Sequence, residues 1–377
     1  MTSVVMGPYA TQILGDLGAD VICVEDAKGD TNRAMGPGPE KQLSGVSMNL
    51  LRNKRNVCLN LKQADGRAAL LRIAATCDVL VTNLRPGPLQ RLGLTYADVR
   101  PVRPDIIFCQ AQGFPTDSPR AADPAYDDIM QAATGIADSF TRQVGTPNMA
   151  PTLVADKVSG LTIAYGIMAA LYHRAVTGEG QHLEVPMSDA VTAFTLVEHG
   201  SSAISVPPQG PAGYPRILTP NRRPQKTLDG WIAVLPYSMG NYRALFREGG
   251  REDLLDDERL QSEKSRILNS HLLYELAAEI LATNTTAHWI EFCEREGIPS
   301  SPVRTLDELV DEQPLAEHPT AGTYHVITSP VRFSATPASV RSHAAHIGEH
   351  GPEILGEVGL TDADIEALRR SGAMPRG

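Results

Sequence analysis

The sequence predicts an α/β protein with a Rossmann-like, doubly wound large domain and a smaller α+β domain. Short β-rich runs alternate with helical patterns through the first half of the chain, which is typical of parallel βαβ units with helices on both faces of a sheet. The chain is 377 residues long, whereas a single hydrophobic core stops growing at roughly 250–300 residues. We therefore expect two domains.

The elements of the large domain follow one another at short intervals. Helical patterns cover residues 9–17, 63–75 and 156–175, and strand-like runs cover residues 20–24, 78–82, 106–110 and 182–185. Only residues 1–6 precede Gly7-Pro8, so the first strand of the sheet is expected to be very short or to lie upstream of residue 1. The long helix is expected to end at Gly178, because glycine readily adopts a left-handed C-terminal cap.

The second half of the chain predicts the smaller domain. Residues 200–220 are rich in Pro, Gly and Ser, which is typical of a crossing between domains. Beyond them we expect a strand at 231–236, amphipathic helices at 241–246, 270–282 and 286–296, short strands from about residue 314 and a last helix at 363–371. The large domain is thus expected over residues 1–199, completed by residues 314–377, with the linker and small domain over residues 200–313.

Composition narrows the possible functions. The formal charge of −10 argues against nucleic-acid binding, which normally shows a basic footprint. The five cysteines are scattered without a CxxC pair, which indicates reduced thiols and a cytoplasmic location rather than disulfides or a zinc site. The longest apolar run, around residues 161–171, is interrupted by polar residues and glycine and falls short of the ~18–20 residues of a membrane span. No signal-peptide pattern is present, so we expect no membrane association.

Several motifs carry little weight. The run Gly36-Pro37-Gly38-Pro39 predicts a turn rather than a phosphate loop, because its prolines lack the N–H groups that hold phosphate. No Walker, Rossmann-glycine or GxSxG motif is present. His343 and His346 have the spacing of metal ligands, but without a supporting Cys or carboxylate we expect a solvated tail and no metal.

Basic and polar residues follow a predicted strand. The run Asn83-Leu84-Arg85-Pro86-Gly87 comes after the strand at 78–82, and ligands of doubly wound sheets bind at the carboxyl ends of strands. An ordinary loop with a solvated arginine is an equal alternative. Residues 52–55 (Arg-Asn-Lys-Arg) and Lys62 add positive charge that could hold the phosphates of a nucleotide-like ligand.

Asp156 begins the long apolar helix and has two interpretations. Its carboxylate could cap the helix, which the pattern alone favours. It could also act as a nucleophile that forms an acyl intermediate beside a crevice at the strand ends. Asp127 and Asp128, which follow Tyr126, are weaker candidates with the same alternative of a capping pair.

Taken in order, these segments resemble the class III CoA-transferases, the CaiB/BaiF family that includes formyl-CoA transferase, carnitine CoA-transferase and 2-methylacyl-CoA racemase. The resemblance covers nearly the whole chain, and its specificity lies in the ordered set rather than in any one fragment. The segments that carry it are residues 7–12, 17–25, 30–33, 53–55, 59–62, 83–87, 92–94, 126–135 and 155–160.

The resemblance implies an enzyme that moves CoA from an acyl-CoA donor to a carboxylic acid acceptor through an aspartyl-CoA thioester on Asp156. CoA would be a substrate, with no tightly bound cofactor and no metal. Backbone amides near Gly7, or at residues 238–240, would stabilise the oxyanion. The implied CoA contacts are Val5, Met6, Leu59, Lys62, Asn83, Leu84 and Arg91, with Arg85 and Arg33 as basic neighbours.

The resemblance has two departures and further implications. Tyr126 stands where the family's racemases have a histidine, so proton exchange of the 2-methylacyl-CoA racemase type is the alternative activity. The family's first strand, before the first helix, is largely absent.

The resemblance implies an interlocked homodimer whose site lies between the large domain of one subunit and the small domain of the other. A CoA-binding protein without activity, in which Asp156 only caps a helix, is a third interpretation. No residue type identifies the donor or acceptor acid.

Overall fold

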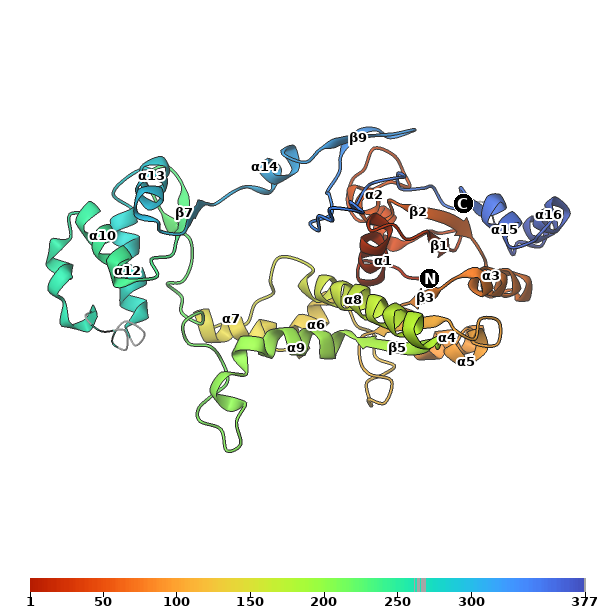
Figure 1. The fold of residues 1–377 in the computed structure, drawn as a ribbon, viewed down its shortest axis with the longest axis horizontal. Helices are drawn as coiled ribbons and strands as arrows, with labels where there is room; N and C mark the ends of the chain where they lie inside the picture. Colours follow the sequence, from red (N-terminus) through yellow and green to blue (C-terminus); the bar gives the residue numbers. More distant parts are fainter. Residues whose placement is uncertain (261, 263–264, 266–268, 376–377) are drawn as a thin grey trace. The chain divides into compact units, whose positions relative to one another are not determined.

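The computed structural model of the chain describes residues 1–260, 262, 265 and 269–375 (Figure 1). It is a mixed α/β protein with two compact units. Unit 1 consists of residues 1–135, 150–195 and 313–377, and unit 2 of residues 136–149 and 196–312. The domain limits predicted above stay a prediction. The units differ from them chiefly in that residues 136–149 fall in unit 2.

The strands at the centre of unit 1 are parallel. β1 (Val21–Glu25) pairs with β2 (Lys54–Cys58). Separately, β3 (Val79–Thr82), β4 (Ile107–Gln112) and β5 (Gln181–Pro186) form a sheet in the order β3-β4-β5. The predicted parallel βαβ pattern is confirmed. The described strands form two separate parallel sheets, β1-β2 and β3-β4-β5, so the doubly wound arrangement of the large domain stays a prediction.

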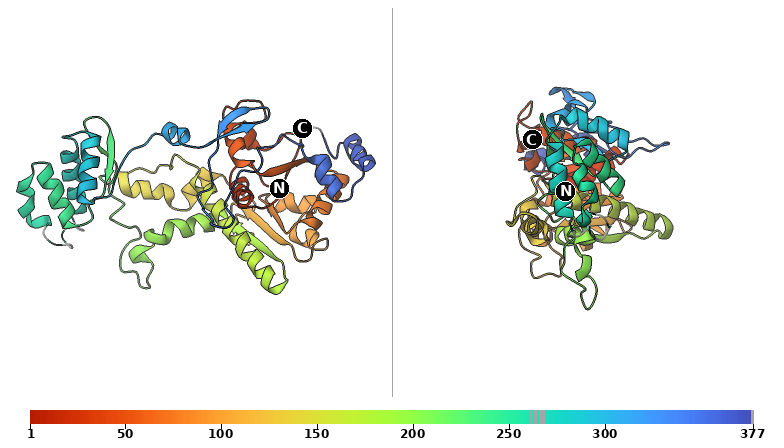
Figure 2. Two further views of the ribbon diagram at one scale, coloured as in Figure 1. Left: turned by 45° about the horizontal axis from the view of Figure 1, so that its top comes forward. Right: turned by 90° about the vertical axis from the view of Figure 1, so that its left-hand side faces the viewer.

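Helices cover these strands. The core of unit 1 is built by α3, β4 and α15, with Leu70, Ile73, Phe108, Ile354 and Leu355 buried in one cluster. The C-terminal α15 packs against α3 and β2, as Figures 1 and 2 show in blue and orange. The helices are α1 (Met6–Asp16), η1 (Thr31–Ala34), α2 (Gly45–Leu50), α3 (Ala64–Thr76), α4 (Pro86–Leu92), α5 (Tyr96–Val99), α6 (Asp127–Ala133), α8 (Val154–Thr177), α15 (Gly351–Glu357) and α16 (Asp362–Ser371).

The remaining elements of unit 1 are few. α9 (Met187–His199) begins in unit 1 and continues into unit 2, and β9 (Leu315–His318) and β10 (Gly322–His325) form an antiparallel pair. α8 ends at Gly178 in the left-handed conformation, as predicted (φ 78°).

With 24 residues, α8 is long and apolar enough by length and composition to cross a membrane, although it packs against α1, α6, β4 and β5. That the chain has no membrane span therefore stays a prediction.

Unit 2 has its own core. β6 (Gln225–Lys226), β7 (Trp231–Val234) and β8 (Ser300–Pro302) form an antiparallel sheet in that order. Phe246, Trp289 and Phe292 are fully buried in one cluster between the helices. The strand and the three amphipathic helices predicted here are confirmed. The helices are α7 (Ile136–Val144), η2 (Ser201–Ala203), α10 (Met239–Glu248), η3 (Glu252–Asp256), η4 (Glu258–Leu260), α12 (Ser270–Leu281), α13 (Thr286–Glu296) and α14 (Leu306–Asp311).

Candidate active site

Asp156 lies inside the first turn of α8 rather than at its cap. α8 begins at Val154, its N-cap is Leu153, and no side chain caps it locally. The interpretation of Asp156 as the N-cap is therefore wrong. Its Oδ1 instead accepts a hydrogen bond from the backbone N–H of Met6, the first residue of α1, at 3.2 Å. The N-termini of α1 and α8 thus meet at this carboxylate, and both favour negative charge.

Asp127 holds Asp156 from the other side. Its Oδ1 accepts a hydrogen bond from the backbone N–H of Asp156 (3.0 Å), so this carboxylate caps α8 from a different helix. Its Oδ2 accepts from Nε2 of Gln131 (2.6 Å), and Oε1 of Gln131 accepts from the N–H of Ala150 (2.8 Å). Asp127 and Gln131 are both buried. Two carboxylates therefore lie side by side in a position fixed by the fold.

Gly160 permits the close approach that brings Met6 to Asp156. A Cβ atom built on Gly160 would lie 2.9 Å from the carbonyl oxygen of Met6 and 2.8 Å from the ring of Tyr9. Such distances are shorter than normal van der Waals contact, so a larger residue would push α1 away from α8. Asp156 lies one turn before Gly160 on α8, so this displacement of α1 would break the hydrogen bond from the N–H of Met6 to Asp156.

The loop before α1 is strained and held at several points. Val4 has φ +68°, which is a rare conformation for a β-branched residue and persists only where its surroundings enforce it. Its N–H donates to Oδ1 of Asp30 (2.9 Å), and its carbonyl accepts from Nδ2 of Asn32 (3.3 Å). Asn83 exchanges two hydrogen bonds with the backbone of Ser3 (3.0 and 2.8 Å). The start of α1 is therefore fixed in place beside Asp156.

Burial and a neighbouring charge raise the pKa of Asp156. Burial contributes most, the carboxylate of Asp127 adds to it, and the N–H of Met6 opposes both, so that the pKa rises from 3.8 to about 6. At neutral pH the group is still largely ionised. Among the residues that the structure describes, no ion pair joins Asp156 or Asp127 to a cation. A buried, ionised and incompletely compensated carboxylate is a suitable nucleophile.

The residues predicted to contact CoA occupy different environments. Val5 and Met6 are buried at the start of α1 beside Asp156, and Asn83 is tied to the same loop through Ser3. Leu59 belongs to the core and Leu84 packs against it, so the side chain of Leu59 is not available to a ligand. The exposed cations of the predicted set are Lys62, in the turn before α3, Arg85, at the N-cap of α4, and Arg91, in the last turn of α4.

The other predicted basic residues support the fold. Arg33 forms a buried ion pair with Glu25 (2.9 Å) and Arg52 forms one with Asp16 (2.7 Å). Lys54 is buried and donates from Nζ to the carbonyl of Pro8 (2.8 Å). The prediction that these side chains offer positive charge to a phosphate is therefore wrong.

Arg55 and the two other predicted loops also have structural roles. Arg55 is paired with Asp20, Glu353 and Glu357. Residues 36–39 are irregular backbone with bends at Gly36 and Pro39, and a Cβ on Gly38 would collide with the carbonyl of Leu43. The alternative oxyanion site at residues 238–240 belongs to unit 2, and there Ser238 caps α10 by accepting from the N–H of Asn241 (3.1 Å).

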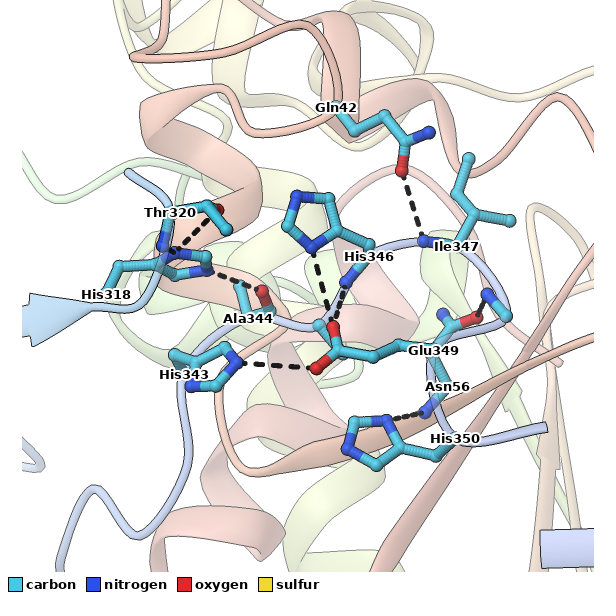
Figure 3. A network of polar contacts seen from close by, with 12 residues as sticks. Gln42, Asn56, His318, Thr320, His343, Ala344, His346, Ile347, Glu349 and His350 are labelled. Atoms are coloured by element: carbon cyan, nitrogen blue, oxygen red, sulfur yellow. Dashed lines mark hydrogen bonds and ion pairs between the residues drawn. The ribbon is translucent and has the colours of Figure 1, made fainter. Parts of the chain in front are cut away.

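His343 and His346 are not a solvated tail. Figure 3 shows both rings facing Glu349. Nε2 of His343 lies 3.6 Å from one carboxylate oxygen and Nδ1 of His346 lies 3.5 Å from the other, while Nε2 of His346 lies 3.1 Å from Glu40. In the described part of the chain no group of three His, Cys, Asp or Glu residues has the arrangement of a metal site. The contact between His346 and Glu40 ties the C-terminal segment to the N-terminal half of unit 1, whereas Glu349 holds the two histidines within that segment.

Sequence reasoning missed Gln131 as a partner of Asp127 and treated Asp127 only as a weak candidate. The signal was present, because a carboxamide four residues after a carboxylate on a helix lies on the same face. Asp128, the other candidate, is exposed. What the sequence could not show is that Asp127 caps α8 rather than its own helix.

Comparison with known proteins relates this geometry to a family of enzymes. The family model described as CoA-transferase family III matches residues 1–351. A succinate–glutarate CoA-transferase of Agrobacterium fabrum is 29% identical over 385 aligned residues, which cover 95% of this chain and 93% of the relative. A formyl-CoA:oxalate CoA-transferase of Streptomyces coelicolor is 29% identical over 406 aligned residues, covering 99% and 97%. The crystal structure of a CaiB/BaiF family protein from Brucella suis superposes with a TM-score of 0.80 at 26% identity, covering 95% of this chain and 97% of that one.

Proposed function

The chain belongs to CoA-transferase family III, and we propose that it moves CoA from an acyl-CoA donor to a carboxylic acid acceptor through a covalent intermediate on Asp156. The observation that supports this proposal is the Asp156 carboxylate itself. It is buried and lies at the meeting point of two helix N-termini, and its burial, together with the neighbouring carboxylate of Asp127, raises its pKa to about 6.

The proposed reaction has four steps and consumes no proton. The carboxylate of Asp156 attacks the carbonyl carbon of the donor thioester, and the C–S bond breaks to give a mixed anhydride and CoA thiolate. The thiolate attacks the aspartyl carbonyl and releases the donor acid as a carboxylate, which leaves an aspartyl-CoA thioester. The acceptor carboxylate then attacks this thioester to give a second anhydride and CoA thiolate. Attack of the thiolate on the acceptor acyl carbon gives the new acyl-CoA and regenerates Asp156.

The electrostatics of the site favour the first step. Two neighbouring anions repel each other in a buried site, where charges are weakly screened. When Asp156 becomes an anhydride or thioester it loses its charge, and the repulsion from Asp127 is relieved. Backbone N–H groups in the first turn of α1, where Met6 already donates to Asp156, are oriented to stabilise an oxyanion.

Recognition of CoA is proposed at the loop before α1 and at the exposed cations. Lys62, Arg85 and Arg91 are exposed and have the charge to hold the phosphates of CoA. The named relatives act on short acids, so succinate, glutarate and oxalate are the first acceptors to test.

A trapping experiment tests the covalent step. The protein is incubated with an acyl-CoA without acceptor and treated with hydroxylamine, which converts an aspartyl thioester or anhydride to a hydroxamate. We expect peptide mass spectrometry to find the modification on Asp156 and not on exposed Asp128. Transfer activity without any trapped Asp156 would contradict the mechanism. Exchange of the α-proton with solvent deuterium in the absence of an acceptor would instead support a racemase.

A homodimer is the second part of the proposal, and an exposed apolar stripe on α8 supports it. The stripe repeats every three or four residues, which places its members on one face of the helix. Its residues are Leu161, Tyr165, Met168, Tyr172 and Val176, each at least 50% exposed. An apolar face of this length is unusual on a soluble monomer.

Mutation of this stripe tests the dimer. We expect the chain to be a dimer by light scattering, and Tyr165→Glu with Tyr172→Glu to weaken it, whereas Lys157→Glu, exposed on the same helix, leaves it intact. A monomer that binds lipid vesicles through this face would contradict the proposal.

A further inference from the structure

Unit 2 contains a cavity of its own, with a volume of about 480 Å³. Cavities that hold small molecules have volumes of ~300–1,000 Å³. Its lining comes from the segment that leads into β6, from the end of β7, from the start of β8 and from α10 and α12, which Figure 1 shows together in unit 2. All the lining residues belong to unit 2, so this unit forms the cavity by itself.

The buried part of the lining, called the floor below, is apolar. It consists of Tyr242 on α10 and of Tyr274, Ala277 and Leu281 on α12, all of which are buried. A charged group among such side chains would lose its hydration without gaining a partner of opposite charge. The floor therefore suits an alkyl chain or an aromatic ring and disfavours a charge.

The mouth of the cavity is positively charged. Arg222 and Arg223 are exposed and belong to the lining, which includes no Asp or Glu among the described residues. Other arginines of unit 2 are paired, such as Arg251 with a carboxylate oxygen at 2.9 Å and Arg304 with one at 2.6 Å. In the described part of the chain, no ion pair joins Arg222 or Arg223 to a carboxylate. Two guanidinium groups at one mouth have the geometry to hold a carboxylate.

The carboxylate of Glu275 holds the arginine-bearing segment in place without belonging to the lining. Glu275 follows Tyr274 on α12, and its Oε1 accepts a hydrogen bond from Nδ2 of Asn221 at 2.8 Å. Asn221 immediately precedes Arg222 in the chain. This bond therefore fixes the segment that carries the two guanidinium groups against the helix that supplies most of the floor.

We propose that this cavity binds an organic carboxylate with an apolar body, namely a short alkyl or aromatic monocarboxylic acid. Its carboxylate is held by Arg222 and Arg223 at the mouth, and its apolar body rests on the floor. A dicarboxylic acid of similar size would place its second charge against the floor, which disfavours its binding.

A role for this ligand follows if the transfer reaction proposed above is correct. A free carboxylic acid is a substrate of that reaction, and the cavity binds a free carboxylic acid. Resting on the proposed function, the cavity therefore selects the acid partner of the transfer and favours monocarboxylic acids over oxalate and succinate.

Binding to the full chain without acyl-CoA tests the ligand class, and it does not depend on Asp156. We expect isothermal titration calorimetry to show saturable binding of phenylacetate or hexanoate. Phenylacetamide, which has the same shape without the charge, and succinate should each bind more weakly by about tenfold or more. No binding of either monocarboxylate, or equal binding of phenylacetamide, would overturn the proposal. Displacement of a bound monocarboxylate by adenosine 3′,5′-bisphosphate would assign the cavity to a nucleotide and would also overturn it.

Variants of the mouth locate the binding. Arg222→Gln together with Arg223→Gln should weaken the binding of phenylacetate by about tenfold or more. Arg247→Gln, which changes an exposed arginine of α10 outside the lining, should leave it unchanged. Urea unfolding shows that both variants fold. Binding to the double variant that equals binding to the parent would overturn the proposal.

Kinetics test the link to the transfer reaction. In the double variant we expect the KM for the acid to rise by about tenfold, while kcat and the KM for acyl-CoA change little. Weaker binding of the acid with an unchanged KM would overturn the assignment of the cavity to the acid partner. If the parent transfers CoA to no acid at all, the proposed function fails, whereas the calorimetric result on the cavity stands.

Discussion

Two groups of buried carboxylates in unit 1 differ in what faces them. Asp16 and Glu25 each meet a guanidinium group, that of Arg52 at 2.7 Å and that of Arg33 at 2.9 Å. Asp127 and Asp156 meet backbone N–H groups, a carboxamide and each other. The first group consists of compensated charges that fix the packing of the N-terminal elements. The second retains a charge that folding alone does not require.

The difference separates stability from reactivity. A buried ion pair roughly balances its own desolvation cost, and removal of one partner leaves an uncompensated charge. Repulsion between two adjacent carboxylates raises the free energy of the folded state until one of them becomes neutral. Such arrangements are concentrated at functional sites. We therefore expect mutations in the first group to act on stability and mutations in the second to act mainly on transfer.

Loss of the Asp156 carboxylate should have the largest effect. Asp156→Ala removes the nucleophile, so we expect transfer to fall by about 10⁴-fold or more, which is on the order of 5 kcal/mol in the barrier. Asp128→Ala removes an exposed carboxylate from the start of α6 and is the matched control. Initial rates of acyl-CoA formation measure both variants. Full exchange activity in Asp156→Ala would remove Asp156 from the mechanism.

Removal of Arg52 should reduce the stability of the folded chain rather than its transfer activity. Among the residues that the structure describes, Arg52→Met leaves the buried Asp16 with Gln12 and Asn53 as its remaining hydrogen-bond donors. We expect the free energy of unfolding in urea to fall by about 3–5 kcal/mol. Transfer per folded molecule should change little. Arg369→Met, which breaks a surface pair with Glu366, should cost less than about 1 kcal/mol. If Arg52→Met is destabilised and its transfer rate per folded molecule is also lost, the separation between stability-determining and reactive carboxylates would be wrong.

The sequence predicted this distinction only in part. Helical and strand periodicity located the elements that carry both groups, because burial leaves a regular spacing of apolar residues. Asp156 was found through its position before an apolar helix and through an ordered set of short motifs. The partner of each charge depends on contacts between distant segments, such as Arg52 with Asp16 and Met6 with Asp156. Composition therefore suggested a basic phosphate site at residues 52–55, whereas the fold uses three of these four side chains for ion pairs and a buried hydrogen bond.

The stability of the chain should depend on pH through Asp156. The folded state raises the pKa of Asp156 from 3.8 to about 6, so the folded chain binds this proton more tightly than the unfolded chain does. Near pH 4 Asp156 therefore lowers the free energy of unfolding very little. The loss of stability grows as pH rises from about 4 to about 6 and reaches at most about 3 kcal/mol, at 1.36 kcal/mol per pKa unit. Asp156→Asn carries no charge, and we expect it to be more stable than the parent at pH 7 and equal to it at pH 4. Urea unfolding at both values measures the difference, and a variant that is less stable at pH 7 would contradict the raised pKa of Asp156.

Neutralising Asp127 should have the smallest effect and shows how the two carboxylates act together. Asp127→Asn keeps an oxygen that can accept from the N–H of Asp156 but removes the charge that raises its pKa. The rate of transfer should fall as pH drops through the pKa of Asp156, near 6 in the parent, because the nucleophile becomes protonated. In Asp127→Asn this acidic limb should move to lower pH, and the rate at pH 7 should fall by about tenfold, since Asp156 is no longer destabilised by its neighbour and Gln131 loses an acceptor. Asp128→Asn should leave the profile in place. A limb that stays near pH 6 in Asp127→Asn would mean that burial alone sets the pKa of Asp156, and Asp127 would then be only the cap of α8.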